Sequence, residues 1–290
     1  MKYTKFNNYS NTFVFDTWIK WESITIFWWI HWNEIAWIKT INMIIENLSN
    51  QKLKLLKWKL ILAYWNEEAI KIWKRDYNYN LNRLFKDEYL KSNSDEYEII
   101  RAKQLSEIMN KSDVLLDIHS VSSDSVPFIF CENIEKEIKI VSNIYNWKTI
   151  IWWWDIAWDL LSWGTDWYMH KLWKIAYTLE CWNHNSENAS DIWFKASLNL
   201  LNYFWLILYN NLDINWKNEL IEMYKIQTTK SWNFEFEKWM SNFKIINKWD
   251  LIWIDWDIKV YAEDDFIILL PNYEKTKIWE EIFYYWKKLI

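Results

Sequence analysis

Short apolar runs alternate with amphipathic segments over the first two-thirds of the chain. Five of these runs are bounded by polar residues and are typical of strands buried in a sheet. They cover residues 23–30, 59–64, 113–119, 126–131 and 174–181. Helical periodicity marks residues 35–48, 95–110 and 187–209. This alternation predicts an α/β fold, in which helices cover both faces of a central sheet.

The pattern changes near residue 212. Beyond it, short β-like pieces are separated by Asn, Asp and Trp. They cover residues 222–229, 251–254, 258–261 and 266–270. The sequence therefore predicts two units, an α/β domain over residues 1–211 and a small antiparallel β-rich domain over residues 212–290.

Composition narrows the class of protein. The chain has 290 residues, of which 51% are hydrophobic and 25% charged, so it encodes a folded core and not a disordered chain. Its apolar runs are shorter than the roughly 18 residues that a membrane span needs, and we see no signal peptide. The net charge of −5 argues against a nucleic-acid partner. We expect a cytoplasmic protein with no membrane partner.

The two cysteines, Cys131 and Cys181, lie in apolar surroundings. This setting favours free thiols in a reducing compartment, although a single disulfide stays open.

The usage of glycine and tryptophan is unusual. The chain has one glycine, Gly164, and 28 tryptophans, many of which stand at turn-like positions such as Trp249-Asp250 and Trp256-Asp257. Turns with positive φ need glycine, and so many large side chains at turns would overpack or expose apolar surface. Some bacteria read the codon UGA as glycine. We therefore hypothesise that most of these tryptophans are glycine in the natural protein.

Two histidines stand at the ends of predicted strands, where α/β proteins place ligands. His31 and Glu34 follow the first buried run at the start of a helix, so both side chains project to one side. His119 ends another run. Two His and one Glu form a typical catalytic zinc shell with a position left for water. A solvated helix start is the alternative for His31 and Glu34, and Asp117 is either a support for His119 or a loop carboxylate.

Arginine is scarce, with three residues against 31 lysines. Arg75 and Arg83 lie eight residues apart, and the planar guanidinium holds a carboxylate in a bidentate way that lysine cannot match. This favours recognition of a carboxylate, with an incidental surface pair as the alternative. We expect Arg101, in a helical stretch, to lie on a solvated face.

Glu180 ends the buried run over residues 174–179. A carboxylate there is costly to bury without a role or a partner. It is either a general base for a metal-activated water or a structural, ion-paired carboxylate.

With glycine in place of tryptophan, four segments resemble the aspartoacylase and succinylglutamate desuccinylase family of zinc-dependent deacylases, related in fold to the zinc carboxypeptidases. They read I-H-G-N-E-I-A-G over residues 30–37, N-L-N-R-L-F over 80–85, D-I-H-S over 117–120 and T-L-E-C-G-N over 178–183. The similarity runs from about residue 23 to residue 210, and the stretch 249–253 resembles the family's C-terminal β domain. The resemblance implies a mixed central sheet with a small C-terminal antiparallel β domain.

The resemblance also implies roles for the matching positions. His31, Glu34 and His119 would hold one Zn²⁺ per chain. The substrate carboxylate would bind to Asn82 and Arg83, Arg75 would polarise the scissile carbonyl, and Glu180 would act as general base and acid.

The expected activity is hydrolysis of the amide bond of a small N-acyl amino acid or a similar carboxylate-bearing substrate. A metallocarboxypeptidase-like peptidase and a catalytically silent binding protein are the alternatives, and a homo-oligomer stays open. The chain departs from the family near Asp166, Tyr168 and His170, where aspartoacylases place a tyrosine and an arginine on the substrate. We expect His170 and His184 to lie at the surface or the rim of the site.

Overall fold

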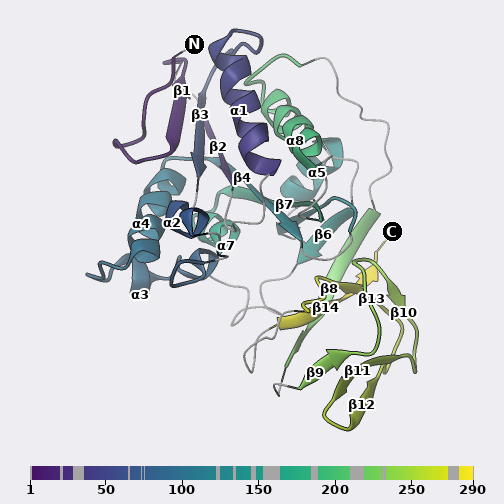
Figure 1. The fold of residues 1–290 in the computed structure, drawn as a ribbon. Coiled ribbons are helices and arrows are strands. Elements are labelled where there is room, and N and C mark those ends of the chain that lie inside the picture. The colour runs from purple at the N-terminus through teal and green to yellow at the C-terminus, as the bar shows by residue number, and fades with distance from the viewer. Residues whose placement is uncertain are drawn as a thin grey trace.

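The protein is an α/β structure built around one large mixed sheet, shown in the computed structural model of Figure 1. The structure describes residues 2–19, 22–28, 36–64, 66–72, 74, 76–121, 125–132, 135–144, 148–152, 164–183, 189–209, 219–229, 231, 233–273 and 281–289.

The strands among these residues are β1 (Thr12–Asp16), β2 (Ser23–Trp28), β3 (Lys59–Tyr64), β4 (Val114–Val121), β5 (Phe128–Glu132), β6 (Lys148–Trp152), β7 (Ile175–Asn183), β8 (Glu219–Thr228), β9 (Phe234–Phe236), β10 (Ile245–Ile246), β11 (Leu251–Asp255), β12 (Ile258–Tyr261), β13 (Phe266–Leu269) and β14 (Glu281–Lys288). The helices are α1 (Ala36–Ser49), α2 (Glu67–Lys71), α3 (Asp87–Leu90), α4 (Tyr97–Asn110), α5 (Glu135–Ile144), α7 (Thr165–Lys171) and α8 (Ala189–Tyr203), with a 3₁₀ turn, η1, at Leu81–Arg83.

The sheet has the strand order β1-β3-β2-β4-β7-β5-β6-β8-β14-β13-β10. Strands β3, β2, β4 and β7 run parallel to one another, whereas β5 is antiparallel to β7. The five apolar runs of the first two-thirds form β2, β3, β4, β5 and β7 with shifts of a few residues at their ends. The predicted mixed sheet is therefore confirmed.

The two faces of the parallel strands carry different cores. On one face, Leu116, Ile118 and Leu179 belong to a cluster that α1, α5 and α8 cover. On the other face, Leu115 and Ala176 pack with residues of α4 and α7 (Figure 1). Because side chains alternate along a strand, Asp117 and His119 follow Leu115 onto the face of α4 and α7.

The C-terminal strands both extend the central sheet and form a small sheet of their own. Strand β8 pairs in parallel with β6, and β14, β13 and β10 continue from it. Strands β12, β11 and β9 form the separate antiparallel sheet. The predicted boundary at residues 211 and 212 lies outside the described residues and stays a prediction. Among the described helices, none has the length and apolarity to cross a membrane.

Several tryptophans adopt a backbone conformation that favours glycine. Among the described residues, twelve that are not glycine have positive φ, and six of these are tryptophan. They are Trp18, Trp58, Trp173, Trp205, Trp249 and Trp256, with φ between 56° and 74°. An L-residue pays about 1–2 kcal/mol for this conformation, and glycine pays almost nothing.

Two of the six end helices in the same way. After α7, the N–H of Trp173 donates to the carbonyl of His170 and the N–H of Lys174 to that of Met169. After α8, Trp205 and Leu206 repeat the pattern. This is the Schellman motif, whose left-handed position is usually glycine. The geometry agrees with the hypothesis that these codons specify glycine in the natural protein.

We therefore expect Trp173→Gly to raise the free energy of unfolding by about 1 kcal/mol, because strain is removed and the side chain, 97% exposed, loses little packing. Urea unfolding of the printed sequence and the variant measures the change.

Trp239→Gly is the matched control. Trp239 is also exposed, but its φ is not positive and its ring stacks on Tyr273 at 4.4 Å. We expect this variant to gain nothing. Equal effects of the two substitutions would contradict the backbone explanation, and an intact mass of the natively expressed protein that includes 28 tryptophans would contradict the glycine hypothesis.

Candidate active site

A buried pair of polar side chains lies near the carboxyl end of β4. The Nε2 atom of His119 lies 3.1 Å from Oδ2 of Asp117, and both side chains are buried. The two residues are two positions apart on one strand, so their side chains share a face. A carboxylate beside the ring restricts the orientation of a histidine, and a carboxylate in this place is a usual companion of a metal-binding histidine.

Glu180 lies beside this pair on the neighbouring strand. In the parallel register of β4 and β7, His119 is the partner of Glu180, and Asp117 is the partner of Thr178. Neighbouring strands are about 4.8 Å apart, so the predicted ligand and the predicted base lie side by side. Two side chains that the sequence separates by 61 positions thus meet at one sheet edge.

The other predicted ligands lie outside the described residues. His31 and Glu34 fall in the stretch 29–35, and Arg75 is likewise not described. The last described residue of β2, Trp28, pairs with Ile118, directly before His119. Among the described residues there is no group of three side chains that could hold a metal ion. The convergence of the three predicted ligands stays a prediction.

Asn82 and Arg83 lie in the 3₁₀ turn η1. The turn is fixed by Asn80, whose side chain accepts a hydrogen bond from the N–H of Asn82, and by the buried side chain of Leu81. Arg83 donates from Nη1 to the carbonyl of Asn82 at 3.0 Å, and its Nη2 lies 3.6 Å from Oε1 of Glu281. The guanidinium therefore faces the first residue of β14.

A second residue of β14, Tyr284, lies within electrostatic range of Arg83 and Glu281. Burial raises the pKa of the Tyr284 phenol well above its ordinary value. The charge of Glu281 also raises this pKa, that of Arg83 lowers it, and that of Glu180 raises it. The phenol thus lies within electrostatic reach of predicted residues from both sides of the site.

Sequence reasoning missed Tyr284 and Glu281. Both lie on the last strand, and their place beside the site depends on β8 and β14 continuing the central sheet. No local pattern in the sequence carries that information.

Comparison with known proteins supports the resemblance to the desuccinylase/aspartoacylase family. Residues 23–144 match the family model described as Succinylglutamate desuccinylase/Aspartoacylase catalytic domain. Over this stretch, which is less than half of its length, the chain is similar to the desuccinylase/aspartoacylase family. The resemblance that the motifs indicated is therefore confirmed, and the family is one of deacylases. No curated protein matches the chain significantly.

Several solved structures share the fold of this chain. Succinylglutamate desuccinylase from Vibrio cholerae is 16% identical, with a TM-score of 0.77 over 96% of this chain and 85% of that one. The product-bound ectoine utilization protein EutE (DoeB) from Ruegeria pomeroyi is 14% identical, with a TM-score of 0.73 over 95% and 88%. Murine aminoacylase 3 is 13% identical, with a TM-score of 0.71 over 92% and 95%.

Asp166, Tyr168 and His170, where the sequence departs from the aspartoacylase pattern, have buried side chains. Asp166 accepts hydrogen bonds from the N–H of Trp167 at 2.8 Å and from the hydroxyl of Thr178 at 3.2 Å. The Tyr168 hydroxyl donates to Asn110 at 3.1 Å. These groups are engaged by the protein itself, so they hold α7 in place.

Two expectations from the sequence are wrong. The side chain of His170 is buried, and its Nε2 lies 2.9 Å from Oε1 of Glu137. Arg101 is buried as well, donating to the carbonyl of Tyr64 and, at 2.9 Å, to Gln104. The Tyr64 carbonyl and Glu137 come from segments remote in sequence. His184 lies outside the described residues.

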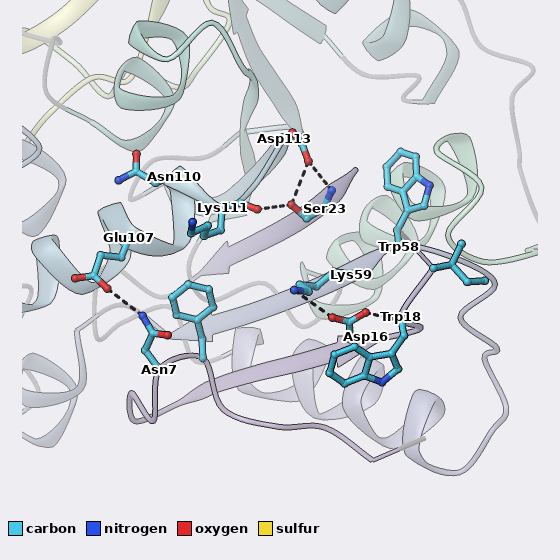
Figure 2. Close-up of a pocket in the computed structure, with 12 residues that line it drawn as sticks. Asn7, Asp16, Trp18, Ser23, Trp58, Lys59, Glu107, Asn110, Lys111 and Asp113 are labelled. Carbon is cyan, nitrogen blue, oxygen red and sulfur yellow. Dashed lines mark hydrogen bonds and ion pairs between the residues drawn. The ribbon is translucent and has the colours of Figure 1, made fainter. Parts of the chain in front are cut away.

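A pocket at the opposite end of the sheet is distinct from this site (Figure 2). It lies at the amino ends of β2 and β3, and its polar groups pair with one another. Asp16 lies 3.1 Å from Lys59, and Asp113 accepts from the N–H of Ser23 at 2.7 Å. The candidate active site therefore stays at the other edge, at His119.

The buried His170 predicts a dependence of stability on pH. Burial alone lowers its pKa, but the hydrogen bond and charge of Glu137, with the charges of Glu132 and Asp166, outweigh burial and raise it. Because the folded pKa lies above the unfolded value of about 6.5, the stabilisation is fully present below that pH and is lost as the pH rises through the folded pKa.

We expect the free energy of unfolding to differ most between wild type and His170→Asn near pH 6, and less at higher pH. Urea unfolding between about pH 5.5 and about pH 9 measures this. Glu137→Gln, which removes the main partner, should reduce the difference between acidic and alkaline pH in the same way. A difference that does not change with pH would contradict the charged pair.

Proposed function

We propose that the protein is a zinc-dependent hydrolase that cleaves the amide bond of a small N-acyl amino acid or a similar carboxylate-bearing substrate. The observation that carries this proposal is the register of β4 and β7, which sets Glu180 beside His119 and its supporting Asp117. The match of residues 23–144 to a deacylase family supports it.

The residues present fit a metal ion. His119 has its Nε2 against a carboxylate, which leaves the lone pair of the ring on Nδ1 in that tautomer. With His31 and Glu34, which follow β2, it would complete the two-His, one-Glu shell of a catalytic zinc. When bound, zinc supplies Lewis acidity and lowers the pKa of a coordinated water toward about 7.

Glu180 is the group that moves the proton. Its carboxylate takes a proton from the attacking water and delivers it to the leaving nitrogen, so that the amine departs neutral. Burial beside Phe128, its register partner on β5, keeps bulk water away from this carboxylate.

Asn82 and Arg83 bind and orient the substrate. The guanidinium of Arg83 offers two parallel N–H groups to a substrate carboxylate, in a geometry that a lysine ammonium cannot reproduce. Glu281 neutralises this guanidinium before substrate binds. In the proposal, Arg75 polarises the scissile carbonyl. The cytoplasmic location and any homo-oligomer also remain predictions.

Glu180→Gln tests the general base. We expect kcat to fall by at least about 100-fold, because the amide cannot accept the proton, whereas bound zinc stays at one per chain. Hydrolysis of a panel of N-acyl amino acids and metal analysis of the same samples measure the two quantities.

Glu107→Gln is the matched control. Glu107 lies at the opposite end of the sheet, where it accepts hydrogen bonds from Asn7 and Tyr9. It should leave both quantities unchanged. Full activity of Glu180→Gln would exclude its role as base, and a zinc-loaded wild type that hydrolyses nothing in the panel would overturn the hydrolase.

Arg83→Lys tests recognition of the carboxylate. We expect KM to rise about tenfold, equivalent to about 1.4 kcal/mol, because the bidentate contact is lost while the charge is kept. Steady-state kinetics on the best substrate of the panel measures it. Arg101→Lys should lower the urea midpoint without changing KM, since Arg101 serves the fold. An unchanged KM in Arg83→Lys would place the substrate carboxylate elsewhere.

A further inference from the structure

Thr165, the first residue of α7, is fixed between two parts of the site. Its hydroxyl donates to Oδ2 of Asp117 at 2.5 Å, and its backbone N–H donates to Oδ1 of Asn82 at 3.2 Å. The side chain of Thr165 is buried. The residue comes from the segment that the family motifs leave unaligned, so no motif assigns it a role.

The hydrogen bond to Asp117 has a defined direction. A carboxylate only accepts, so the Thr165 hydroxyl is the donor. The same oxygen, Oδ2, lies 3.1 Å from Nε2 of His119. Among the described residues, the other oxygen of Asp117 is buried without a hydrogen-bond partner. The Thr165 hydroxyl is thus the hydrogen-bond donor on the oxygen that the His119 ring contacts, and it restricts the rotation of this carboxylate.

The backbone of Thr165 is held so that its hydroxyl stays on Asp117. A Cβ on Gly164 would lie 2.9 Å from Oδ1 of Asp166 and 3.1 Å from Oδ1 of Asn82, so a larger residue would displace these two side chains. On the other side, Asp166 is bound by Thr178 of β7. The start of α7 is thus packed against η1 and β7 at once.

We propose that Thr165 is a positioning residue for the metal ligand His119, acting through Asp117. Its hydroxyl holds the Asp117 carboxylate in the plane that fixes the His119 ring, with the ring proton on Nε2 and the lone pair on Nδ1. The inference rests on the proposed function, because it takes His119 as a ligand of zinc.

The test is the dissociation constant for Zn²⁺ of the full chain, measured without substrate by competition with a chelator. Thr165→Val removes the hydroxyl and keeps the branched shape and the backbone N–H. We expect it to weaken zinc binding about tenfold, since groups that support a metal ligand typically contribute 10–100-fold in affinity. Thr165→Ser, which restores the hydroxyl, should stay within about twofold of wild type.

Thr25→Val is the matched control, because Thr25 is also buried but its hydroxyl bonds with Ser112, near the amino end of β2 and away from Asp117. It should leave zinc affinity unchanged. Wild-type affinity in Thr165→Val overturns the proposal, and so does an equal loss in the valine and serine variants, which would assign the effect to packing.

Asp117→Asn removes the charge of the carboxylate that lies between Thr165 and His119. It provides the test if Thr165→Val does not fold. It should weaken zinc binding at least as much, and an unchanged affinity overturns the proposal. A wild type that binds no zinc overturns both this inference and the proposed function. If the affinities follow the expected pattern but no N-acyl amino acid or peptide is hydrolysed, Thr165 keeps its role and the proposed function fails.

Discussion

The contact between the buried carboxylate of Asp117 and the imidazole of His119 is the interaction on which the site depends. A carboxylate with no exposure to water is costly unless donors replace its hydration. Here the partners of the carboxylate are the ring of His119, two positions along β4, and the Thr165 hydroxyl at the start of α7, so the charge can be buried only when strand and helix are both in place. The buried carboxylate therefore requires the packing of α7 against β4.

The same requirement explains why polar residues interrupt a strand that is otherwise apolar. Strand β4 is buried along its whole length, and its two faces contribute to two separate cores. Asp117 and His119 share the face of Leu115, where α7 supplies the Thr165 hydroxyl as a donor. A shift of β4 by one residue would turn both polar side chains into the aliphatic core under α1, α5 and α8, away from this hydroxyl. The register is thus specified by polar contacts as well as by hydrophobic ones.

Much of this could be predicted from the sequence, and the reason for the rest is physical. Apolar runs locate β2, β3, β4 and β7 because the hydrophobicity of a buried strand is visible in its own local sequence. Chemistry at strand ends made His119 and Glu180 candidates, and the register brings them together. Arg101 and His170 were assigned to the surface because a charge on a helix is usually solvated, whereas their partners, the Tyr64 carbonyl and Glu137, come from other elements. Thr165 has no signal at all, since its role exists only where α7 meets β4.

Residues of the last strand, β14, also lie beside the candidate site. Glu281 lies 3.6 Å from Arg83, and Tyr284 lies within electrostatic range of Glu180, because β14 pairs with β8, and β8 pairs with β6 at the edge of the α/β part. Under the proposed function, Arg83 must release a carboxylate product. A partly buried guanidinium with no other acidic partner would bind that product too tightly, because dissociation would leave its charge unpaired. The ion pair with Glu281 offers an alternative partner at 3.6 Å, long enough for a substrate carboxylate with bidentate geometry to compete. Under the proposed function, the C-terminal strands therefore take part in setting how tightly substrate and product are held.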